Sequence, residues 1–219
     1  MIKFENITKY FDTPDARINI LLETSFEIKE NEFVALMAPS WSGKTTILNM
    51  ISWIDNYQNW KIIVNNQNIA DLKWDDITTR RGQNISFIFQ QFYLVPQLTI
   101  KENIDLIIDL NNIKRQFETD EILWLLNLLH RRNSYPHELS GGEQQRVAIA
   151  RAFVGKTGII LADEPTGNLD AKNAEIIMKI LQDLHKKSKK TILMITHDKN
   201  IAIRAEKIIS LSNYKIENI

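Results

Sequence analysis

The residues best suited to chemistry lie in one short stretch, 38–46, which reads Ala-Pro-Ser-Trp-Ser-Gly-Lys-Thr-Thr. It follows an apolar run at 33–37 and precedes a run of helical character at 47–51. Strand, tight loop and helix in this order form the context of a phosphate-binding loop, where backbone N–H groups and a helix N-terminus surround phosphate oxygens. Lys44 would then reach β- and γ-phosphates, and the Thr45 hydroxyl would ligate Mg²⁺.

This loop departs from the pattern G-x-x-x-x-G-K-[ST] at its first glycine, where Ala38 stands, and it carries Trp41 in its middle. An ordinary strand–turn–helix containing Gly-Lys-Thr by chance is the simpler alternative, and the motifs downstream argue against it. The residues expected to contact the phosphates are Ala38, Pro39, Ser40, Trp41, Ser42, Gly43, Lys44, Thr45 and Thr46.

A second motif is the apolar run 159–162, which ends in Asp163 and Glu164. Beside a phosphate-binding loop, the first acid is expected to hold Mg²⁺ and the second to polarise the attacking water as general base. The alternative is a strand that simply ends in a polar turn.

A third motif reads Leu-Ser-Gly-Gly-Glu-Gln-Gln-Arg from residue 139 to residue 146. Bare backbone N–H groups, a hydroxyl and a positive helix end would make Ser140, Gly141 and Gly142 an anion site. The same residues also predict a helix N-cap, with Ser140 and Glu143 forming a capping box. Both interpretations can hold together, because a helix N-cap at Ser140 would itself place the hydroxyl and the backbone N–H groups that form the anion site.

The composition is that of an ordinary globular protein, with 44% hydrophobic and 25% charged residues in 219. The 27 basic and 27 acidic residues cancel, so no net field points to nucleic acid or anionic lipid. No cysteine is present, which excludes disulfides and thiolate metal sites. Neither a signal peptide nor an apolar run of about 20 residues is visible, so we expect a cytoplasmic protein that would serve a membrane only through a partner.

Strand patterns at 2–9, 22–28, 33–37, 61–64, 85–89, 158–162, 191–196 and 208–211 surround a stretch, 99–154, where helical periodicity takes over. A helix is also expected at 173–187, and the basic run 186–190 that follows is expected to be a solvated helix end. Residues 12–17 read as a loop, Asn65-Asn66 as a hairpin turn, and 208–211 as the final strand with Asn213 as its turn. Strands alternating with helices predict an α/β fold with a mainly parallel sheet.

With these motifs together, the sequence resembles the ATP-binding subunits of ABC transporters, whose signature motif is L-S-G-G-E-Q. The resemblance implies a P-loop NTPase core with a mainly parallel sheet, an N-terminal antiparallel β subdomain and an inserted α-helical subdomain. We expect one domain over 1–219, with core and β subdomain at 1–91 and 155–219 and the helical subdomain at 92–154.

The resemblance also implies ATP and Mg²⁺ as cofactors and two subunits that pair head to tail, with Ser140 and Gly142 contacting the γ-phosphate bound by the other subunit. It assigns Gln90 to sensing Mg²⁺ and the attacking water, although Gln91 is a rival for that role. His197 would contact the γ-phosphate, and Asp170 would lie in the loop that links the two sites. The aromatic that stacks on adenine would be Phe11, although Tyr10 could substitute and Phe11 could instead be a core residue.

Within that family, residues 87–96 and 135–140 resemble the exporter ATPases of the lipoprotein-release and macrolide-export type. This implies an ATPase that drives a separate membrane permease, paired with itself or another ATPase subunit at the inner face of the membrane. One alternative is a soluble ABC ATPase acting on nucleic acid or the ribosome. A zero net charge and one copy of each motif argue against that alternative and against a nucleic-acid partner.

The tryptophans are unusual, because the chain has five of them and only seven glycines, where about fifteen glycines are typical of this length. Trp41, Trp53 and Trp60 stand where the family has glycine. We hypothesise that the gene comes from a lineage that reads UGA as glycine. The UGA codons at positions 41, 53 and 60 would then have been translated here as tryptophan. The rival hypothesis is an inactive ATPase scaffold with genuine tryptophans. It does not explain why the residues that would do the chemistry are intact, namely Lys44, Thr45, Asp163, Glu164, Gln90, His197 and the 139–146 signature.

Overall fold

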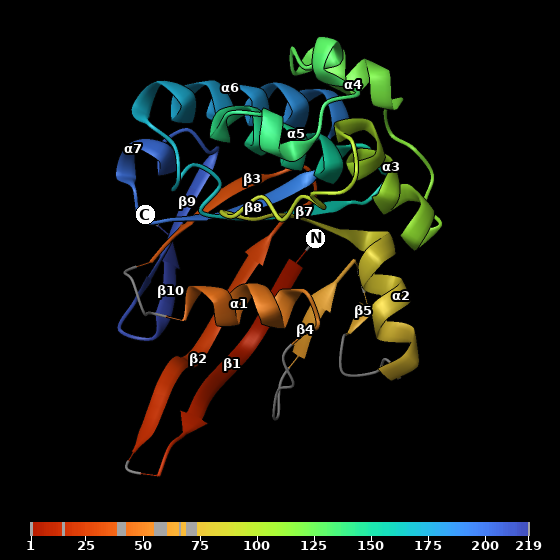
Figure 1. Ribbon diagram of the computed structural model, residues 1–219. Coiled ribbons are helices and arrows are strands. Elements are labelled where there is room, and N and C mark those ends of the chain that lie inside the picture. The colour runs from red at the N-terminus through yellow and green to blue at the C-terminus, as the bar shows by residue number, and fades with distance from the viewer. Residues whose placement is uncertain are drawn as a thin grey trace. The chain divides into compact units, whose positions relative to one another are not determined.

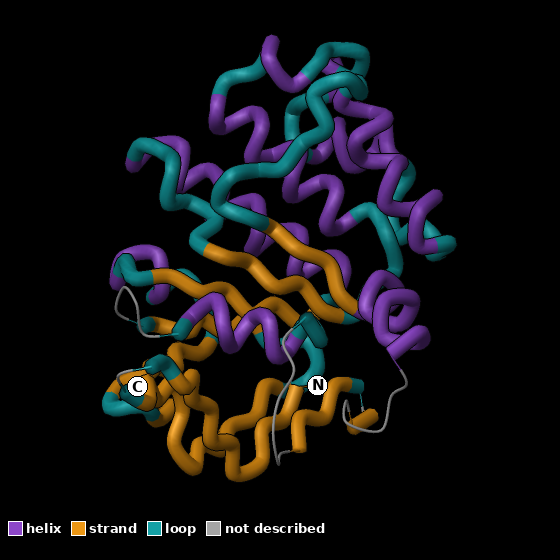
Figure 2. Tube along the Cα trace, turned by 60° about the horizontal axis from the view of Figure 1, so that its bottom comes forward, coloured by secondary structure: helices purple, strands orange, loops and turns teal. Residues whose placement is uncertain are grey.

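The computed structural model describes residues 2–14, 16–38, 43–54, 61–65, 67–68 and 74–218 (Figure 1). The chain divides into two compact units, one made of Met1–Arg81 with Thr191–Ile219 and the other of Gly82–Lys190. The first unit consists mainly of strands and the second mainly of helices (Figure 2).

The first unit contains an antiparallel sheet in the order β2-β1-β4-β5, as predicted for an N-terminal β subdomain. Alternate side chains of β1, among them Ile2 and Phe4, are buried, which is the pattern of a sheet with one covered face. The β1–β2 pairing continues to Asp12 opposite Arg17, so the predicted loop is shorter than expected. The bounds are β1 (Ile2–Asp12), β2 (Arg17–Ile28), β4 (Lys61–Val64) and β5 (Gln67–Asn68).

The same unit contains a mainly parallel group of strands in the order β10-β9-β3-β8. The central strand β3 pairs in parallel with β8 and with β9, and four of its five side chains are buried. Burial on both faces is typical of a strand inside a parallel sheet. The bounds are β3 (Phe33–Met37), β8 (Thr191–Thr196), β9 (Lys207–Ser212) and β10 (Lys215–Asn218), with helices α1 (Lys44–Ile51), α2 (Trp74–Asn84) and α7 (Lys199–Ala202).

The C-terminal hairpin differs from the sequence interpretation in one respect. The strand predicted at 208–211 is not the last one, because β10 pairs antiparallel with it. The turn itself was predicted correctly: Asn213 and Tyr214 have φ values of 47° and 63°, the two positive values of a tight hairpin turn. The helix α2, by contrast, was not anticipated.

The second unit contains the parallel strands β6 (Ile85–Ile88) and β7 (Ile159–Asp163), and all but one of its helices lie between them in sequence. The helical insertion predicted from periodicity is thereby confirmed. The helices α5 and α6 pack side by side (Figure 1). The bounds are α3 (Ile100–Asn111), α4 (Thr119–Leu125), the short 3-10 helices η2 (Leu129–Arg131) and η3 (Pro136–Glu138), α5 (Gly141–Phe153) and, after β7, α6 (Ala171–Ser188).

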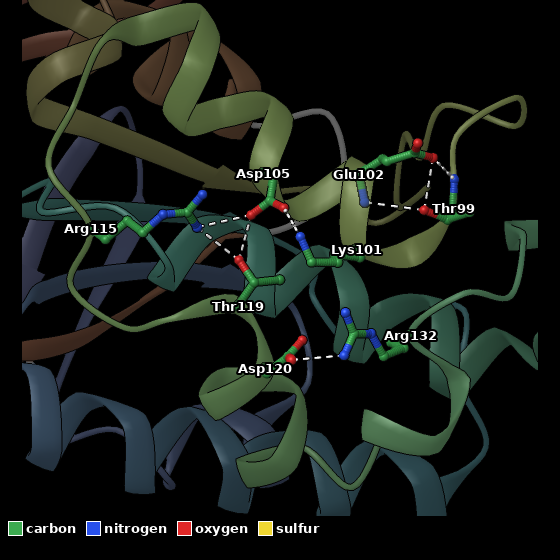
Figure 3. A network of polar contacts seen from close by, with 8 residues as sticks. All are labelled: Thr99, Lys101, Glu102, Asp105, Arg115, Thr119, Asp120 and Arg132. Atoms are coloured by element: carbon green, nitrogen blue, oxygen red, sulfur yellow. Dashed lines mark hydrogen bonds and ion pairs between the residues drawn. The ribbon is translucent and has the colours of Figure 1, made fainter.

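A polar network joins α3 to α4 inside the second unit (Figure 3). The Asp105 carboxylate accepts hydrogen bonds from Lys101 Nζ at 2.9 Å, Arg115 at 2.8 Å and the Thr119 hydroxyl. Burial acts to raise the pKa of Asp105, but the three donors outweigh it, and the net pKa lies below its ordinary value. The charged carboxylate therefore stabilises this part of the fold.

The basic run 186–190 is only partly the solvated helix end that we predicted. Lys186 and Lys187 are exposed, but Lys190 is 3% exposed. Its ammonium donates to the carbonyl oxygens of Gly155 at 2.5 Å and Thr157 at 2.6 Å. Lys190 was misassigned because its stem and charge satisfy buried backbone groups, which a charge pattern cannot reveal.

Among the described helices, none has both the length and the apolar character that crossing a bilayer requires.

Candidate functional site

In the first unit, sheet register places two of the predicted functional segments at the same edge. Met37, the last residue of β3, is opposite Thr196, the last residue of β8. Because the strands are parallel, Ala38, which begins the predicted phosphate-binding segment, and His197 leave the sheet side by side. Ligands of open α/β sheets bind at this carboxyl edge.

Gly43 is the residue from which helix α1 starts, and only glycine fits there. Its φ is 87°, in the left-handed region, and a Cβ atom at this position would come 2.2 Å from the Ile20 Cγ2 atom. A glycine that enters a helix in this conformation leaves the first N–H groups of the helix without side-chain cover. This arrangement fits a loop that binds phosphate through its backbone.

The remaining residues of this loop are placed only in part. Ala38 is buried, while Lys44 and Thr46 are half-buried at the start of α1. The side chain of Thr45 lies outside the described part of the chain, and so do Pro39, Ser40, Trp41 and Ser42.

The adenine candidate Phe11 lies near the end of β1 and is 43% exposed, so it is not the core residue that sequence left open. The Lys9 ammonium stands 4.8 Å from its ring centroid. Tyr10 has its ring occupied by the Arg17 guanidinium at 3.8 Å. Each ring thus has a cation over one face, and exposure distinguishes them, because Phe11 is exposed while Tyr10 is half-buried.

In the second unit, the other predicted catalytic residues also share one strand edge. Ile88, the end of β6, is opposite Ala162 in the parallel strand β7. Gln90 therefore leaves the sheet beside Asp163 and Glu164. Glu164 has a φ of 44°, which costs a non-glycine residue about 1 kcal/mol or more. Strain of this kind gathers at functional sites.

The side chain of Gln90 is held by a residue that sequence reasoning did not single out. Gln90 Nε2 donates to Asn168 Oδ1 at 3.0 Å, and Asn168 Nδ2 donates to the Gln90 carbonyl oxygen at 2.9 Å. This contact favours Gln90 over its rival Gln91.

Ser140 caps helix α5, and the predicted capping box is confirmed. Its hydroxyl accepts from the Glu143 backbone N–H at 3.4 Å, and the Glu143 carboxylate accepts from the Ser140 N–H at 2.9 Å and its hydroxyl at 2.7 Å. The side-chain hydrogen bond from Ser140 is the main cause that lowers the pKa of Glu143. Ser140 and Gly141 are exposed, so this helix start is open to an anion.

The start of α5 also packs on the start of α6. A Cβ atom at Gly142 would come 2.8 Å from Asn173 Oδ1, so a larger residue there would displace the Asn173 amide. Asn173 in turn donates to Asp170 from its backbone at 2.9 Å and from its side chain at 2.7 Å. These bonds lower the pKa of Asp170, whose side chain caps α6. The structure thus brings Asp170 close to the signature glycine.

A second unpredicted residue is Arg151, on helix α5. Its guanidinium donates to the carbonyl oxygens of Tyr93 at 2.6 Å and Phe92 at 2.7 Å. Both residues have positive φ values, 57° for Phe92 and 46° for Tyr93. No local pattern marks Arg151 or Asn168, because each acts on a loop far away in sequence.

Within the described residues, no three acidic or histidine side chains gather into a metal site. Mg²⁺ does not need one, because it binds through one or two protein oxygens, water and substrate phosphates. Asp163 and Gln90, at neighbouring strand ends, are oxygen ligands of the kind that Mg²⁺ takes.

Comparison with known protein families matches residues 21–167 to the family described as ABC transporter. A relative from Methanocaldococcus jannaschii, the uncharacterized ABC transporter ATP-binding protein MJ0796, is 42% identical over 224 residues, which cover 99% of this chain and 95% of that protein. The macrolide export ATP-binding/permease protein MacB of Chlorobium luteolum is 38% identical over 213 residues. That match covers 96% of this chain but only 32% of MacB, so the chain spans about a third of that relative.

Among solved structures, the dimeric post-hydrolysis state of the MJ0796 ATP-binding cassette, bound to ADP and Pi, has a TM-score of 0.85. The two chains are 38% identical, and the match covers 100% of this chain and 98% of the other. The α/β fold predicted from the sequence, with its antiparallel sheet, parallel strands and helical insertion, is confirmed by this likeness.

Proposed function

This chain belongs to the ATP-binding, ATP-hydrolysing subunits of ABC transporters, and on that premise we propose that its two groups of strand-end residues bind and hydrolyse Mg²⁺-ATP between two paired copies. The observation that supports this most is the register of the parallel strands. It sets Met37, at the end of β3, level with Thr196, which precedes His197, and it sets Ile88, just before the Gln90 segment, level with Ala162, which precedes Asp163 and Glu164.

In the first group, the backbone N–H groups at the start of α1 bind the phosphate oxygens, and Gly43 keeps them uncovered. Lys44 places its ammonium at the β- and γ-phosphates. His197 contacts the γ-phosphate, and Phe11 stacks on the base. Each of these is a binding role, and together they hold the reacting phosphate in place.

In the second group, Glu164 accepts a proton from the attacking water. Asp163 and Gln90 would hold Mg²⁺, and the Thr45 hydroxyl is the further ligand that we propose. When bound, Mg²⁺ would neutralise charge that develops on the phosphate oxygens. Glu164 follows the end of β7 directly, and its positive φ is backbone strain of the kind that gathers at functional sites.

The third group, at the start of α5, has no lysine of its own, and its first two residues, Ser140 and Gly141, are exposed while Gly142 is buried. We propose that Ser140, Gly141 and Gly142 contact the γ-phosphate bound by a second copy, paired head to tail. Asp170 lies beside Gly142 through Asn173, so it is placed to relay changes between the two sites. The relative MJ0796 was solved as a dimer, which supports this arrangement.

The paired subunits drive a membrane permease, which is a separate chain. MacB, whose name joins ATP-binding and permease functions, supports an exporter of that general type. The helical subdomain over 92–154, with the Gln90 loop, is the segment proposed to receive the permease. The protein would then work from the cytoplasm, bound to the inner face of the membrane.

The first alternative is an ABC ATPase without a transport role, and it would leave the likeness to MacB unexplained. The second alternative is a non-hydrolysing scaffold, which would follow if Trp41 is genuine and blocks the loop. Co-purification with a membrane protein would separate the transporter subunit from the first alternative. Trp41→Gly tests the second, because it should restore ATP binding and hydrolysis.

The decisive experiment uses Glu164→Gln in a Trp41→Gly background. Without its general base the protein should bind ATP but not hydrolyse it, so ATP should trap a dimer. Size-exclusion chromatography with and without ATP measures this, with Lys44→Ala in the same background as the control that stays monomeric. A Glu164→Gln protein that remains monomeric at saturating ATP would count against the shared site.

A further inference from the structure

Inside the second unit, the Asn168 side chain makes two hydrogen bonds with Gln90, one with its side chain and one with its backbone. Gln90 Nε2 donates to Asn168 Oδ1 at 3.0 Å, and Asn168 Nδ2 donates back to the Gln90 backbone oxygen at 2.9 Å. Both residues are exposed, and 78 positions separate them. Two bonds between the same two exposed residues restrict them far more than one would.

The turn before Asn168 is shaped to allow this approach. The Gly167 N–H donates to the Glu164 carbonyl oxygen at 3.0 Å. A Cβ atom at Gly167 would come 2.8 Å from Gln90 Nε2, so any larger residue would push the Gln90 amide away. One short turn therefore carries both the proposed general base, Glu164, and the residue that holds Gln90.

The pair also determines which end of the Gln90 amide is available. A backbone carbonyl oxygen can only accept, so Asn168 must present its Nδ2 to it and its Oδ1 to Gln90. A flipped Gln90 amide would set its oxygen against Asn168 Oδ1, and two acceptors repel. The nitrogen of Gln90 is thus used by Asn168, and its Oε1 atom is left for other ligands.

The far side of the same loop is fixed separately. Arg151 binds the carbonyl oxygens of Phe92 and Tyr93, which stabilises their left-handed conformations. With the loop held there, movement of the 167–170 turn acts mainly on the Gln90 side chain.

We propose that Asn168 is a positioning residue that directs the Gln90 carboxamide oxygen toward Mg²⁺ and so couples the 167–170 turn to metal binding. This inference rests on the proposed role of Gln90 as a metal ligand. Outer residues that orient a ligand typically affect metal affinity 10- to 100-fold. Asn168 should act only through Gln90, so its effect should vanish when Gln90 is absent.

The test is a double-mutant cycle of Asn168→Ala and Gln90→Ala in a Trp41→Gly, Glu164→Gln background, which does not turn over. MgCl₂ is titrated at fixed fluorescent ATP analogue, and the same analogue is bound in EDTA. We expect Asn168→Ala to weaken apparent Mg²⁺ affinity about 10-fold and to leave binding in EDTA unchanged. In Gln90→Ala protein, the further change should be less than about 2-fold.

Lys179→Ala is the control, because it shortens an exposed side chain of α6 that contacts neither Gln90 nor the 167–170 turn. Its effect should add fully to that of Gln90→Ala. If Asn168→Ala also adds fully, or does not change Mg²⁺ affinity while Gln90→Ala does, the inference is overturned and the proposed function stands. If Gln90→Ala itself leaves Mg²⁺ affinity unchanged, the metal role proposed for Gln90 falls, and the inference falls with it.

Discussion

Gly43 lies so close to Ile20 that a Cβ atom on it would come within 2.2 Å of the Ile20 Cγ2 atom. Its φ of 87° would strain any other residue as well. Two independent constraints therefore act on the glycine that opens α1. The first is the left-handed backbone conformation that the loop requires at Gly43, and the second is the steric contact with Ile20 of β2.

Replacing Gly43 with alanine should therefore reduce both stability and ATP affinity. The left-handed backbone costs about 1 kcal/mol and overpacking about 1–3 kcal/mol, so we expect a loss of about 2–4 kcal/mol in the free energy of unfolding. In a Trp41→Gly background, ATP affinity should fall about tenfold or more, because the shifted loop would lose at least one charge-assisted contact to phosphate. Denaturant unfolding and calorimetric titration measure the two effects.

The Ile20→Ala variant serves as the control for the steric part. In that background, Gly43→Ala should cost only the conformational share of about 1 kcal/mol. Equal costs in both backgrounds would show that contact with Ile20 does not constrain the loop.

The Asp105 network predicts a pH-dependent stability. Its folded pKa lies below the unfolded value of about 3.9, so the carboxylate adds stability above pH ~4 that is lost as pH falls through the folded pKa. Asp105→Asn should cost about 1.5–3 kcal/mol at neutral pH, the range for a hydrogen bond to a charged group. The difference from the unmutated protein should shrink toward pH 3.

Unfolding of both proteins by urea between pH 3 and pH 7 would check this. Asp109→Asn, an exposed carboxyl on the same helix, is the control and should change stability by less than about 0.5 kcal/mol at every pH. A constant difference across the range would show that the charge of Asp105 does not stabilise the network.

The sequence predicted correctly the strand ends from which the candidate residues follow, because the carboxyl ends of parallel strands meet at one edge. Lys44, His197, Asp163 and Glu164 all follow apolar runs that are easy to recognise. Helix α2 was missed because its residues, Trp-Asp-Asp-Ile-Thr-Thr-Arg-Arg-Gly-Gln-Asn, lack apolar periodicity. Asn168, Arg151 and Lys190 were missed because their roles depend on contacts with distant backbone groups.

Trp53 is the described tryptophan that bears on the recoding hypothesis. It has a φ of 62° and is only 4% exposed, and its buried Nε1 atom has no hydrogen-bond partner among the described residues. Position 53, just after α1, thus has the left-handed backbone that glycine usually provides at a helix end. A tryptophan there combines backbone strain with an unsatisfied donor.

Trp53→Gly and Trp53→Ala provide a matched test, because both remove the indole and differ only in backbone freedom. We expect the glycine variant to be the more stable by about 1 kcal/mol. In an ordinary helix the order is opposite, with alanine ahead by about 0.5–1 kcal/mol, and Lys179→Gly against Lys179→Ala in α6 is the control. If alanine is also the more stable residue at position 53, that position does not prefer glycine, and the recoding hypothesis loses its structural support.

The last prediction concerns Trp41, which lies outside the described residues and carries the most weight for function. A phosphate-binding loop brings consecutive backbone N–H groups within hydrogen-bond distance of oxygen, and glycine permits that approach. Losing two charge-assisted contacts, at roughly 1.5–3 kcal/mol each, would weaken ATP binding by tens-fold to thousands-fold. The protein with Trp41 should therefore bind ATP poorly, and Trp41→Gly alone should restore much of the affinity.

Calorimetric titration of the two forms with ATP measures this directly, with Trp124→Ala as the control. Trp124 is exposed on α4 and has no glycine counterpart in the family, so its replacement should leave ATP affinity unchanged. Equal affinity with Trp41 and with glycine would show that the loop tolerates tryptophan. The gene offers a separate check. A UGG codon at position 41, 53 or 60 would exclude recoding at that site, whereas UGA at all three would explain why these tryptophans occur beside an intact signature and an intact Lys44, Asp163, Glu164 and His197.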